Sequence, residues 1–377
     1  MKKLKLMTIV GTRPELIRLS ETIKKADKYF NHIFVHTGQN YDPNLNDIFY
    51  DDLGIRKPDF YLGAVTGDLG ETIGHIIAKS YAVMRDNMPD SLLILGDTNS
   101  TLSAVSAKRL KIPIFHMEAG NRCFDENLPE EMNRRIVDHI ADVNLPYTEH
   151  ARRYLLSEGI CKERVFVIGS PMAEVIYANN DKIEQSNILE RLNLRRRDYF
   201  VLSAHREENI DNEKTFRSLM SAVNALAEHS KKRIIYSVHP RSAKFIKERN
   251  FKFHELVLQM PPFNFSEYGK LISNAYCVIS DSGTIPEEAA VSKFPAVCIR
   301  TSTERPEALD KGVFILGGIG EVEMFQAIQL AVEMFADEEK FESVPDYDSL
   351  NISGKVIRLI QSYTHVVNRG VWRKYDA

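Results

Sequence analysis

Short apolar runs alternate with longer amphipathic stretches along most of the chain. Runs such as Leu92–Leu95 and Ile114–Met117 are almost entirely apolar, which is typical of strands that a parallel sheet buries on both faces. This alternation predicts the α/β class, with parallel sheets joined by right-handed crossovers. The predicted strands are Leu6–Val10, Ile33–His36, Leu92–Leu95, Ile114–Met117, Val165–Ile168, Tyr199–Ser203, Arg233–Val238, Leu256–Met260, Cys277–Ser280 and Ala296–Ile299.

The strand and helix pattern runs through both halves of the chain, whose 377 residues are enough for two domains. A small, helix-breaking segment, Gly169–Pro171, separates the halves. We therefore predict two doubly wound, Rossmann-like domains that face a cleft, with residues 1–170 in the first and residues 171–352 in the second. The last helical stretch, within residues 353–377, is expected to pack back on the first domain.

Composition narrows the class of protein. Hydrophobic residues make up 44% and charged residues 27% of the chain, and the net charge of −3 gives no electrostatic reason to expect nucleic acid. No apolar run approaches the ~20 residues of a membrane helix, and the apolar start of the chain is too short for a signal peptide. The four cysteines form no Cys-x-x-Cys pair. We therefore expect a cytoplasmic protein without nucleic-acid or membrane partners.

Three acids in the first half stand at or near the ends of predicted strands. Asp97 and Glu118 each follow a strand, and Glu130 lies in the first turn of the helix that follows Glu118. Ligands of open parallel sheets bind beyond the carboxyl ends of the strands, so these acids are candidates for one site. Each has a structural alternative, because Asp97 also suits a helix cap and Glu130 suits the dipole of a helix start.

Two arginines lie close to the first turn. Arg13 stands at the turn after the first predicted strand, and Arg18 lies about one turn into the helix that Pro14 begins. Because a guanidinium group matches the geometry of phosphate oxygens, both are candidates for contacts with an anionic substrate.

A second helix start, in the second half, has the features of a phosphate seat. Ser282, Gly283 and Thr284 precede a predicted helix, whose first N–H groups and partial positive charge suit phosphate. Gly283 removes the Cβ that would block a close approach. Glu288 is placed to accept hydroxyl donors from a sugar, and Arg305, after the next strand, to close on an anion. The alternative is an ordinary capped helix.

Two histidines, His205 and His239, follow predicted strands of the second half, although either also suits an exposed loop. Several acids, Arg13 and a phosphate seat together favour proton transfer on a phosphorylated substrate. No His or Cys pair has the spacing of zinc ligands, and the chain has neither Gly-x-Gly-x-x-Gly nor Gly-x-x-x-x-Gly-Lys. We therefore expect no metal and no other cofactor.

Seven short motifs, in order along the chain, match one known family. Through them the chain resembles the non-hydrolysing UDP-N-acetylglucosamine 2-epimerase family over nearly its whole length. The motifs are Gly11–Glu15, Gly96–Thr98, His116–Gly120, Pro129–Arg134, Ala204–Arg206, Asp281–Gly283 and Thr303–Glu307.

The resemblance implies a glycosyltransferase-B-like fold, a UDP-sugar in the cleft, a homodimer and no metal requirement. By the same resemblance, Asp97, Glu118 and Glu130 match the catalytic acids, and His205 matches the active-site histidine. The substrate-binding candidates are Arg13, Arg18, His239, Ser282, Gly283, Thr284, Glu288 and Arg305, with Tyr268 where the family places an aromatic residue near uracil.

Some segments depart from the family pattern. Gln39–Tyr41 stands where the N-acetylglucosamine enzymes carry Gln-His-Arg at an allosteric site, so we expect no such activation. Thr284 stands where a second glycine is usual. With the loop Gly120–Leu128 and the segment Thr301–Gly312, this resembles the branch that epimerises UDP-2-acetamido-2,6-dideoxy-L-talose to UDP-N-acetyl-L-fucosamine for surface polysaccharides.

The reaction implied by the resemblance needs two proton carriers. A carboxylate removes the C2 proton while the C1–oxygen bond to UDP breaks, and a 2-acetamido glycal and UDP remain; a proton then returns to the opposite face of C2 and UDP adds back. One alternative is the epimerisation of UDP-N-acetylglucosamine to UDP-N-acetylmannosamine. Others are a glycosyltransferase, which would need an acceptor site, and a UDP-sugar sensor, which would not need three acids.

Overall fold

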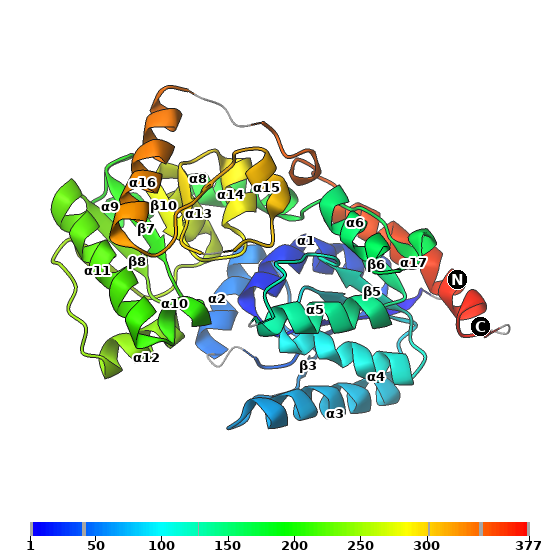
Figure 1. Cartoon of the computed structure of the whole chain (residues 1–377). Helices are drawn as coiled ribbons and strands as arrows, with labels where there is room; N and C mark the ends of the chain where they lie inside the picture. Colours follow the sequence, from blue (N-terminus) through cyan, green and yellow to red (C-terminus); the bar gives the residue numbers. More distant parts are fainter. Residues whose placement is uncertain (1–2, 40–42, 127, 301, 339–341, 375–377) are drawn as a thin grey trace. The chain divides into compact units, whose positions relative to one another are not determined.

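The chain forms two compact units. The computed structural model describes residues 3–39, 43–126, 128–300, 302–338 and 342–374 (Figure 1). Unit 1 comprises Met1–Tyr177 together with Asp346–Ala377, and unit 2 comprises Ala178–Pro345. The sequence had led us to expect these boundaries at residues 170 and 352. In the described ranges, no helix is both long enough and apolar enough to cross a membrane.

Unit 1 is built on a six-stranded parallel sheet with the strand order β3-β2-β1-β4-β5-β6. Its central strands are buried along almost their whole length, as expected for a sheet covered on both faces. The strands are β1 (Lys5–Val10), β2 (Asn31–His36), β3 (Phe60–Tyr61), β4 (Ser91–Leu95), β5 (Ile114–Met117) and β6 (Val143–Leu145).

Helices follow these strands in the order that the amphipathic stretches predict. The first shows why: Pro14 suits its first turn, and its buried residues Leu16, Leu19, Ile23 and Ala26 recur at helical spacing. The helices of unit 1 are α1 (Arg13–Tyr29), α2 (Pro43–Leu53), α3 (Leu69–Asn87), η1 (Asn99–Leu102), α4 (Ser103–Arg109), α5 (Pro129–Ile140), α6 (Glu149–Ser157), η2 (Lys162–Arg164), α7 (Met172–Ala178, which reaches the boundary) and α17 (Ile352–Gly370).

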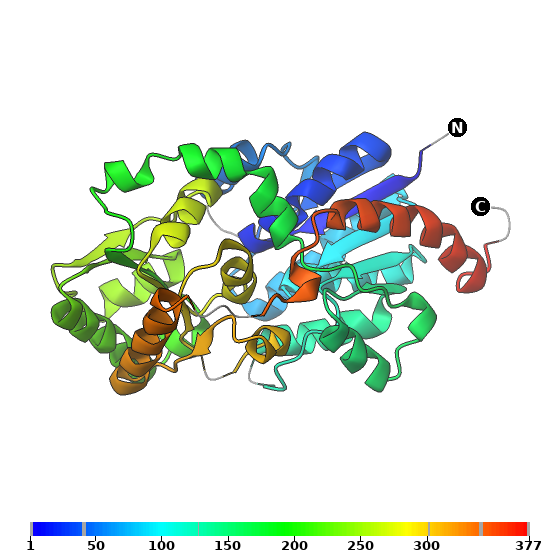
Figure 2. The ribbon, with the colours of Figure 1, turned by 90° about the horizontal axis from the view of Figure 1, so that it is seen from above.

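The C-terminal helix α17 belongs to unit 1 although it follows unit 2 in the chain. It packs against α1, and both views show the red α17 beside the blue α1 (Figures 1 and 2). Its buried residues include Val356, Ile360, Thr364 and Val367, which form one helical stripe. Residues far apart in the sequence therefore close one core.

Unit 2 repeats the architecture, with a six-stranded parallel sheet in the order β12-β11-β10-β7-β8-β9. Its strands are β7 (Tyr199–Ser203), β8 (Arg233–Ser237), β9 (Val257–Met260), β10 (Cys277–Ser280), β11 (Ala296–Cys298) and β12 (Ile315–Leu316). Its helices are α8 (Asn180–Gln185), α9 (Ile188–Arg191), α10 (Glu207–Ile210), α11 (Glu213–Ser230), α12 (Pro240–Glu248), α13 (Phe265–Asn274), α14 (Ile285–Ser292), α15 (Pro306–Asp310), α16 (Glu321–Ala336) and η3 (Pro345–Tyr347, at the boundary).

The two strand orders are equivalent, and both are those of a doubly wound sheet. In each unit the first strand lies between the second and the fourth. The first and fourth strands are neighbours, β1 and β4 in unit 1 and β7 and β10 in unit 2. The connection after the first strand leads to one edge of the sheet, and the connection after the fourth strand leads to the other. We call each of these places a switch point, where ligands of such sheets bind. The predicted α/β class is confirmed.

One predicted strand is wrong. Val165–Ile168 forms only an isolated bridge, between Val165 and Asn144 of β6. Backbone N–H groups of this segment donate to the carbonyl oxygens of Asn144 in β6 and Pro146 just after it. Pro146 directly follows β6 and has no N–H to extend a ladder. The short strands β3, β6 and β12 were not predicted, because two or three residues carry too little periodic signal.

Candidate active site

Asp97 stands directly beyond the end of β4, at the switch point of unit 1. Its carboxylate pairs with Nη2 of Arg134, a side chain from α5 that is almost completely buried. Its carbonyl oxygen accepts a hydrogen bond from Asn133 Nδ2, also on α5, at 3.0 Å. The cap of the following helix η1 is Thr98. Asp97 is therefore held by α5 and does not serve as the helix cap.

Glu118 stands beyond the end of β5, the neighbour of β4. Its backbone adopts a left-handed conformation (φ 63°), which costs a non-glycine residue about 1 kcal/mol. Its Oε2 pairs with Nη1 of Arg18 on α1, and its Oε1 accepts a hydrogen bond from Asn121 Nδ2 at 3.4 Å. Gly96 leaves room for this carboxylate, because a Cβ there would lie 3.2 Å from Oε2.

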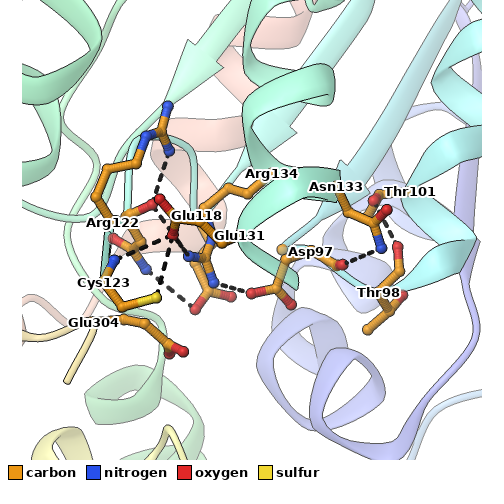
Figure 3. A network of polar contacts seen from close by, with 12 residues as sticks. Asp97, Thr98, Thr101, Glu118, Arg122, Cys123, Glu131, Asn133, Arg134 and Glu304 are labelled. Atoms are coloured by element: carbon orange, nitrogen blue, oxygen red, sulfur yellow. Dashed lines mark hydrogen bonds and ion pairs between the residues drawn. The ribbon is translucent and has the colours of Figure 1, made fainter. Parts of the chain in front are cut away.

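Asp97 and Glu118 belong to one polar network (Figure 3). Arg134, which pairs with Asp97, also donates to the carbonyl oxygen of Asn121 at 3.1 Å, and the Asn121 side chain reaches Glu118. Each acid thus has its own guanidinium partner, and a single residue separates the two pairs.

A second layer of buried charges supports the two strand ends. His116 Nε2 lies 2.8 Å from the carbonyl oxygen of Gly96, and its Nδ1 lies 2.9 Å from Asp138 Oδ1. Asp138 also accepts from the Gly120 N–H (3.1 Å) and pairs with Arg122 (2.8 Å). Burial alone would raise the pKa of the Asp138 carboxyl, but its bonds to His116 and Arg122 hold that pKa below its usual range.

Glu130 and the two arginines of the first turn have different surroundings. Glu130 is half-buried in the first turn of α5. The residue after Glu130, Glu131, belongs to the network around Asp97 among the described residues. Its Oε2 accepts a hydrogen bond from the Cys123 N–H at 3.1 Å. Arg18 contacts Glu118, as described above, and the Arg13 guanidinium lies 5.7 Å from the ring centre of Phe49.

In unit 2, Asp281 joins the two loops at the switch point. It is completely buried after β10 and accepts hydrogen bonds from the backbone N–H groups of His205 and Arg206, both at 2.9 Å, in the loop after β7. Its Oδ1 lies 3.3 Å from His205 Nδ1. The His239 ring lies 5.3 Å from the His205 ring. The structure therefore brings the two predicted histidines together and holds one of them by a buried acid.

The predicted phosphate turn lies beside this pair. Ser282, Gly283 and Thr284 connect β10 to α14, with Thr284 at the helix cap. Thr284 Oγ1 hydrogen-bonds to Glu288 Oε1 at 3.0 Å and to Ser282 Oγ at 3.0 Å. The turn therefore places the hydroxyl groups of Ser282 and Thr284 next to the first N–H groups of α14.

Charged side chains of both signs lie near the turn. A Cβ on Gly283 would lie 3.3 Å from Arg206 Nη2, so this guanidinium stands next to the turn, and it would also lie 3.5 Å from Glu304 Oε2. Arg206 and Arg300 both pair with Glu304, at 3.6 Å and 3.2 Å. Arg305 is buried and pairs with Glu287 at 3.5 Å.

Tyr268, on α13, completes the side chains around the turn. Burial raises the pKa of its hydroxyl well above the usual value, and the charges of Glu288 and Asp281 raise it further. The same hydroxyl hydrogen-bonds to the Ser203 side chain at the end of β7. Tyr268 therefore stays neutral beside the turn.

Several residues of these networks were not predicted as site residues. They are Glu131, Asn133, Arg134, Asp138, Arg206 and Asp281. All of them except Asp138 lie inside the motifs quoted above. The motifs therefore carried the signal, but the pairings depend on strand order. Of the segments that depart from the family pattern, Asn40, Tyr41, Asn127 and Thr301 lie outside the described residues. Within the described ranges, no group of three or more His, Cys, Asp or Glu side chains is arranged to hold a metal ion.

Comparisons with known proteins agree over almost the whole chain. A family model described as UDP-N-acetylglucosamine 2-epimerase matches residues 22–361. The chain is 35% identical over 336 residues to UDP-N-acetylglucosamine 2-epimerase of Methanocaldococcus jannaschii, which covers 87% of this chain and 92% of that protein. It is similar to a solved structure of UDP-N-acetylglucosamine 2-epimerase from Rickettsia bellii, with 45% identity and a TM-score of 0.90 over 99% of this chain and 100% of that one. The M. jannaschii enzyme in complex with UDP-GlcNAc and UDP gives 32% identity and a TM-score of 0.89, over 95% and 99% of the two chains.

Proposed function

The chain belongs to the UDP-N-acetylglucosamine 2-epimerase family, whose members are isomerases, and from this premise we propose that it inverts C2 of a UDP-linked 2-acetamido sugar. The observation that carries the proposal is the pair Asp97 and Glu118, two carboxylates at the ends of neighbouring strands, each beside a guanidinium group. A sensor or a glycosyltransferase has no evident use for such a pair.

The proposed reaction is an elimination followed by an addition. One carboxylate of unit 1 takes the proton from C2, and the electron pair of that C–H bond forms the C1=C2 double bond. The C1–oxygen bond breaks, and its electrons leave with UDP. A second acid then returns a proton to the other face of C2, while a phosphate oxygen of UDP attacks C1. Asp97 and Glu118 are the proposed proton carriers, and Glu130 is the third candidate.

Unit 2 supplies the proposed seat of the diphosphate. The departing UDP carries more negative charge than the bound substrate, so donors and cations that face it stabilise the transition state. The N–H groups at the start of α14 and the nearby Arg206 suit this role. His205 is proposed as the active-site histidine. His239, Arg13, Arg18 and Arg305 are proposed contacts of the UDP-sugar, as are Glu288 and, near the uracil, Tyr268.

The amino sugar itself has two candidates. The segments Gly120–Leu128 and Thr301–Gly312 favour UDP-2-acetamido-2,6-dideoxy-L-talose as substrate and UDP-N-acetyl-L-fucosamine as product. The relatives named above favour UDP-N-acetylglucosamine and UDP-N-acetylmannosamine. We propose the first pair, with the second as the alternative to be tested beside it.

One incubation tests the function and the mechanism together. The purified protein is incubated in D₂O with each candidate UDP-sugar and no acceptor, and proton NMR follows the sugar. We expect one of the two sugars to give its C2 epimer, with deuterium at C2, because the proton on a carboxylate exchanges with solvent.

Each other outcome contradicts a definite part of the proposal. An epimer without deuterium at C2 excludes elimination by proton abstraction. Release of UDP with a free sugar indicates a hydrolysing enzyme. Binding without turnover of either sugar indicates a sensor.

We also propose that the protein is a homodimer in the cytoplasm, as the family resemblance suggests. Light scattering on the purified protein tests the dimer, and a mass near 43.1 kDa would indicate a monomer.

A further inference from the structure

One buried carboxylate joins the two loops at the switch point of unit 1. Glu15, in the first turn of α1, is 2% exposed. Its Oε2 accepts hydrogen bonds from the N–H groups of Gly11 (3.0 Å) and Thr12 (2.7 Å) and from Thr12 Oγ1 (2.8 Å). Its Oε1 accepts one from Thr98 Oγ1, at 3.2 Å. Three of these donors belong to the loop after β1, and the fourth belongs to the loop after β4.

A helix cap does not account for this arrangement. Thr12 and Glu15 form a capping box at the start of α1, in which the Glu15 carboxylate accepts from the Thr12 N–H. That motif requires neither the bond from Gly11 nor the bond from Thr98, which follows a different strand. It also does not require burial, and burying a carboxylate is unfavourable unless several donors surround it.

Two of the residues that donate to Glu15 are adjacent in the sequence to residues used in the proposed reaction. Thr12 is followed by Arg13, and Thr98 is preceded by Asp97. We propose that Glu15 is a positioning residue: by holding the loop after β1 to the loop after β4, it fixes the place of Asp97 relative to Arg13. This inference rests on the proposed function of those two residues, and Glu15 itself takes no part in making or breaking bonds. We call Glu15 with its donors on Gly11, Thr12 and Thr98 the Glu15 clasp.

The chemistry of the clasp suits an acceptor group. All four contacts are donors to Glu15, and an ionised carboxylate has acceptor sites only. Glutamine can keep the arrangement, because its oxygen can accept from Gly11 and Thr12 while its amide donates to the Thr98 hydroxyl. Alanine leaves the donors without a partner and separates the loops. A displacement of about 1 Å at a reacting group lowers a rate by about 10²-fold.

Two isosteric changes and one truncation test the clasp. Thr98→Val removes the hydroxyl that reaches Glu15 and keeps the shape of the side chain, Glu15→Gln keeps the bonds without the charge, and Glu15→Ala removes both. The double variant Glu15→Ala/Thr98→Val measures whether the two residues act as one unit.

Matched controls come from the same unit. Thr364→Val removes a buried hydroxyl that donates to Ile360 O at 2.7 Å in α17. Glu174→Gln changes a buried carboxylate that accepts from the Ser353 N–H at 2.8 Å. Both make the same chemical change as a test variant, away from the switch point.

Turnover with the UDP-sugar substrate should separate the variants. We expect kcat to fall about 10-fold in Thr98→Val and about 100-fold in Glu15→Ala, and to stay within about 3-fold in Glu15→Gln. The double variant should be no slower than Glu15→Ala, because the bond is already lost. Both controls should stay within about 2-fold. Three results would overturn the proposal: an unchanged kcat in Thr98→Val, single effects that multiply in the double variant, or a loss in Glu15→Gln as large as in Glu15→Ala.

Hydrogen exchange provides a test that does not depend on turnover. The amide protons of Gly11 and Thr12 should exchange faster in Glu15→Ala than in the wild type and in the Glu174→Gln control. If the wild type turned over neither UDP-sugar, the proposed function would fail, but the exchange rates of these amides would still show whether Glu15 holds the loop. Unchanged protection at Gly11 and Thr12 in Glu15→Ala would overturn it.

Discussion

Two buried carboxylates at the switch point of unit 1 differ in what surrounds them. Glu118 faces the guanidinium group of Arg18, whereas Glu15 accepts hydrogen bonds from neutral N–H and O–H groups. Burial raises the pKa of Glu15 from 4.5 to about 7, because its hydrogen bonds only partly offset the loss of water. We therefore expect the Glu15 carboxyl to titrate near neutrality.

The Glu15 carboxyl should make the protein less stable as the pH rises. Its pKa is raised on folding, so the stabilisation is complete below pH 4.5 and is lost as the pH rises through about 7. At about 1.4 kcal/mol for each pH unit, the loss is roughly 3 kcal/mol. Glu15→Gln does not titrate, so its free energy of unfolding relative to wild type should increase by about that amount across this range, as measured by urea unfolding. A difference that did not change with pH would contradict the raised pKa.

Removing the charge of either proposed proton carrier should slow the reaction. Asp97→Asn and Glu118→Gln should each lower kcat by ~10²–10⁴, the usual effect of losing a positioned acid or base. The comparison is Asp86→Asn, which removes an aspartate from an exposed pair with Arg85 and should leave kcat unchanged. Steady-state kinetics with the UDP-sugar measure kcat for each variant and for the wild type. If Asp97→Asn kept more than about half of the wild-type kcat, Asp97 would not be a proton carrier.

Among the elements, α5 does most to organise the site of unit 1. Asn133 and Arg134 hold Asp97, and Asp138, one turn further on, holds the Gly120 N–H, His116 and Arg122. The same helix buries Val137 in the core of the unit. The helix α5 therefore anchors the ends of both β4 and β5, and the polar side chains that do so are buried.

Asp138→Asn should weaken this anchor. The change leaves buried Arg122 with one acid partner, Glu158, and breaking a buried ion pair costs about 3 kcal/mol. Because the pKa of Asp138 is lowered, its stabilisation is present above pH 3.8 and is lost as the pH falls through the lowered value. Urea unfolding at neutral pH should show the loss, and the difference from wild type should shrink in acid. Equal stability at neutral pH would contradict the role of this pair.

On the scale of the whole molecule, the same sheet topology occurs twice with different chemistry. In unit 1, two acids with guanidinium partners lie at the switch point, whereas in unit 2 a helix start with hydroxyl groups, the Arg206 guanidinium and the buried Asp281 lie there. We therefore expect variants of the unit 1 acids Asp97 and Glu118 to affect turnover, and variants of the Ser282–Thr284 turn in unit 2 to affect the affinity for UDP.

Gly283→Val tests this division of roles. A Cβ at Gly283 would already lie 3.3 Å from Arg206 Nη2, and the two further methyl groups of valine would occupy the space where a phosphate approaches the turn. We expect the Kd for UDP, measured by calorimetry, to increase about 30-fold, a loss of about 2 kcal/mol.

Two comparisons control for other effects of this change. Gly74→Val, at a glycine with no neighbour within 4 Å of its Cβ position, should bind UDP like the wild type. Asp97→Asn should also keep its affinity for UDP. Wild-type affinity in Gly283→Val would show that the turn is not the phosphate seat.

The sequence by itself determined the alternation of strands and helices. Continuous apolar runs and helix-start residues are local signals, so β4, β5, β7 and β10 were predicted within one residue of their ends. The predicted strands also gave the positions of their carboxyl ends. Asp97, Glu118 and His205 were therefore correctly placed beyond those ends. The strand predicted at Val165–Ile168 failed where a proline beside it removed a hydrogen-bond donor.

The tertiary structure alone decided the partners of these residues. Arg134 lies 37 residues from Asp97, and Arg18 lies 100 residues from Glu118. Glu15 and Thr98 likewise meet across 83 residues. Such pairs form only when strand order brings two loops to one edge of a sheet, and the period of an apolar pattern contains no information about that order.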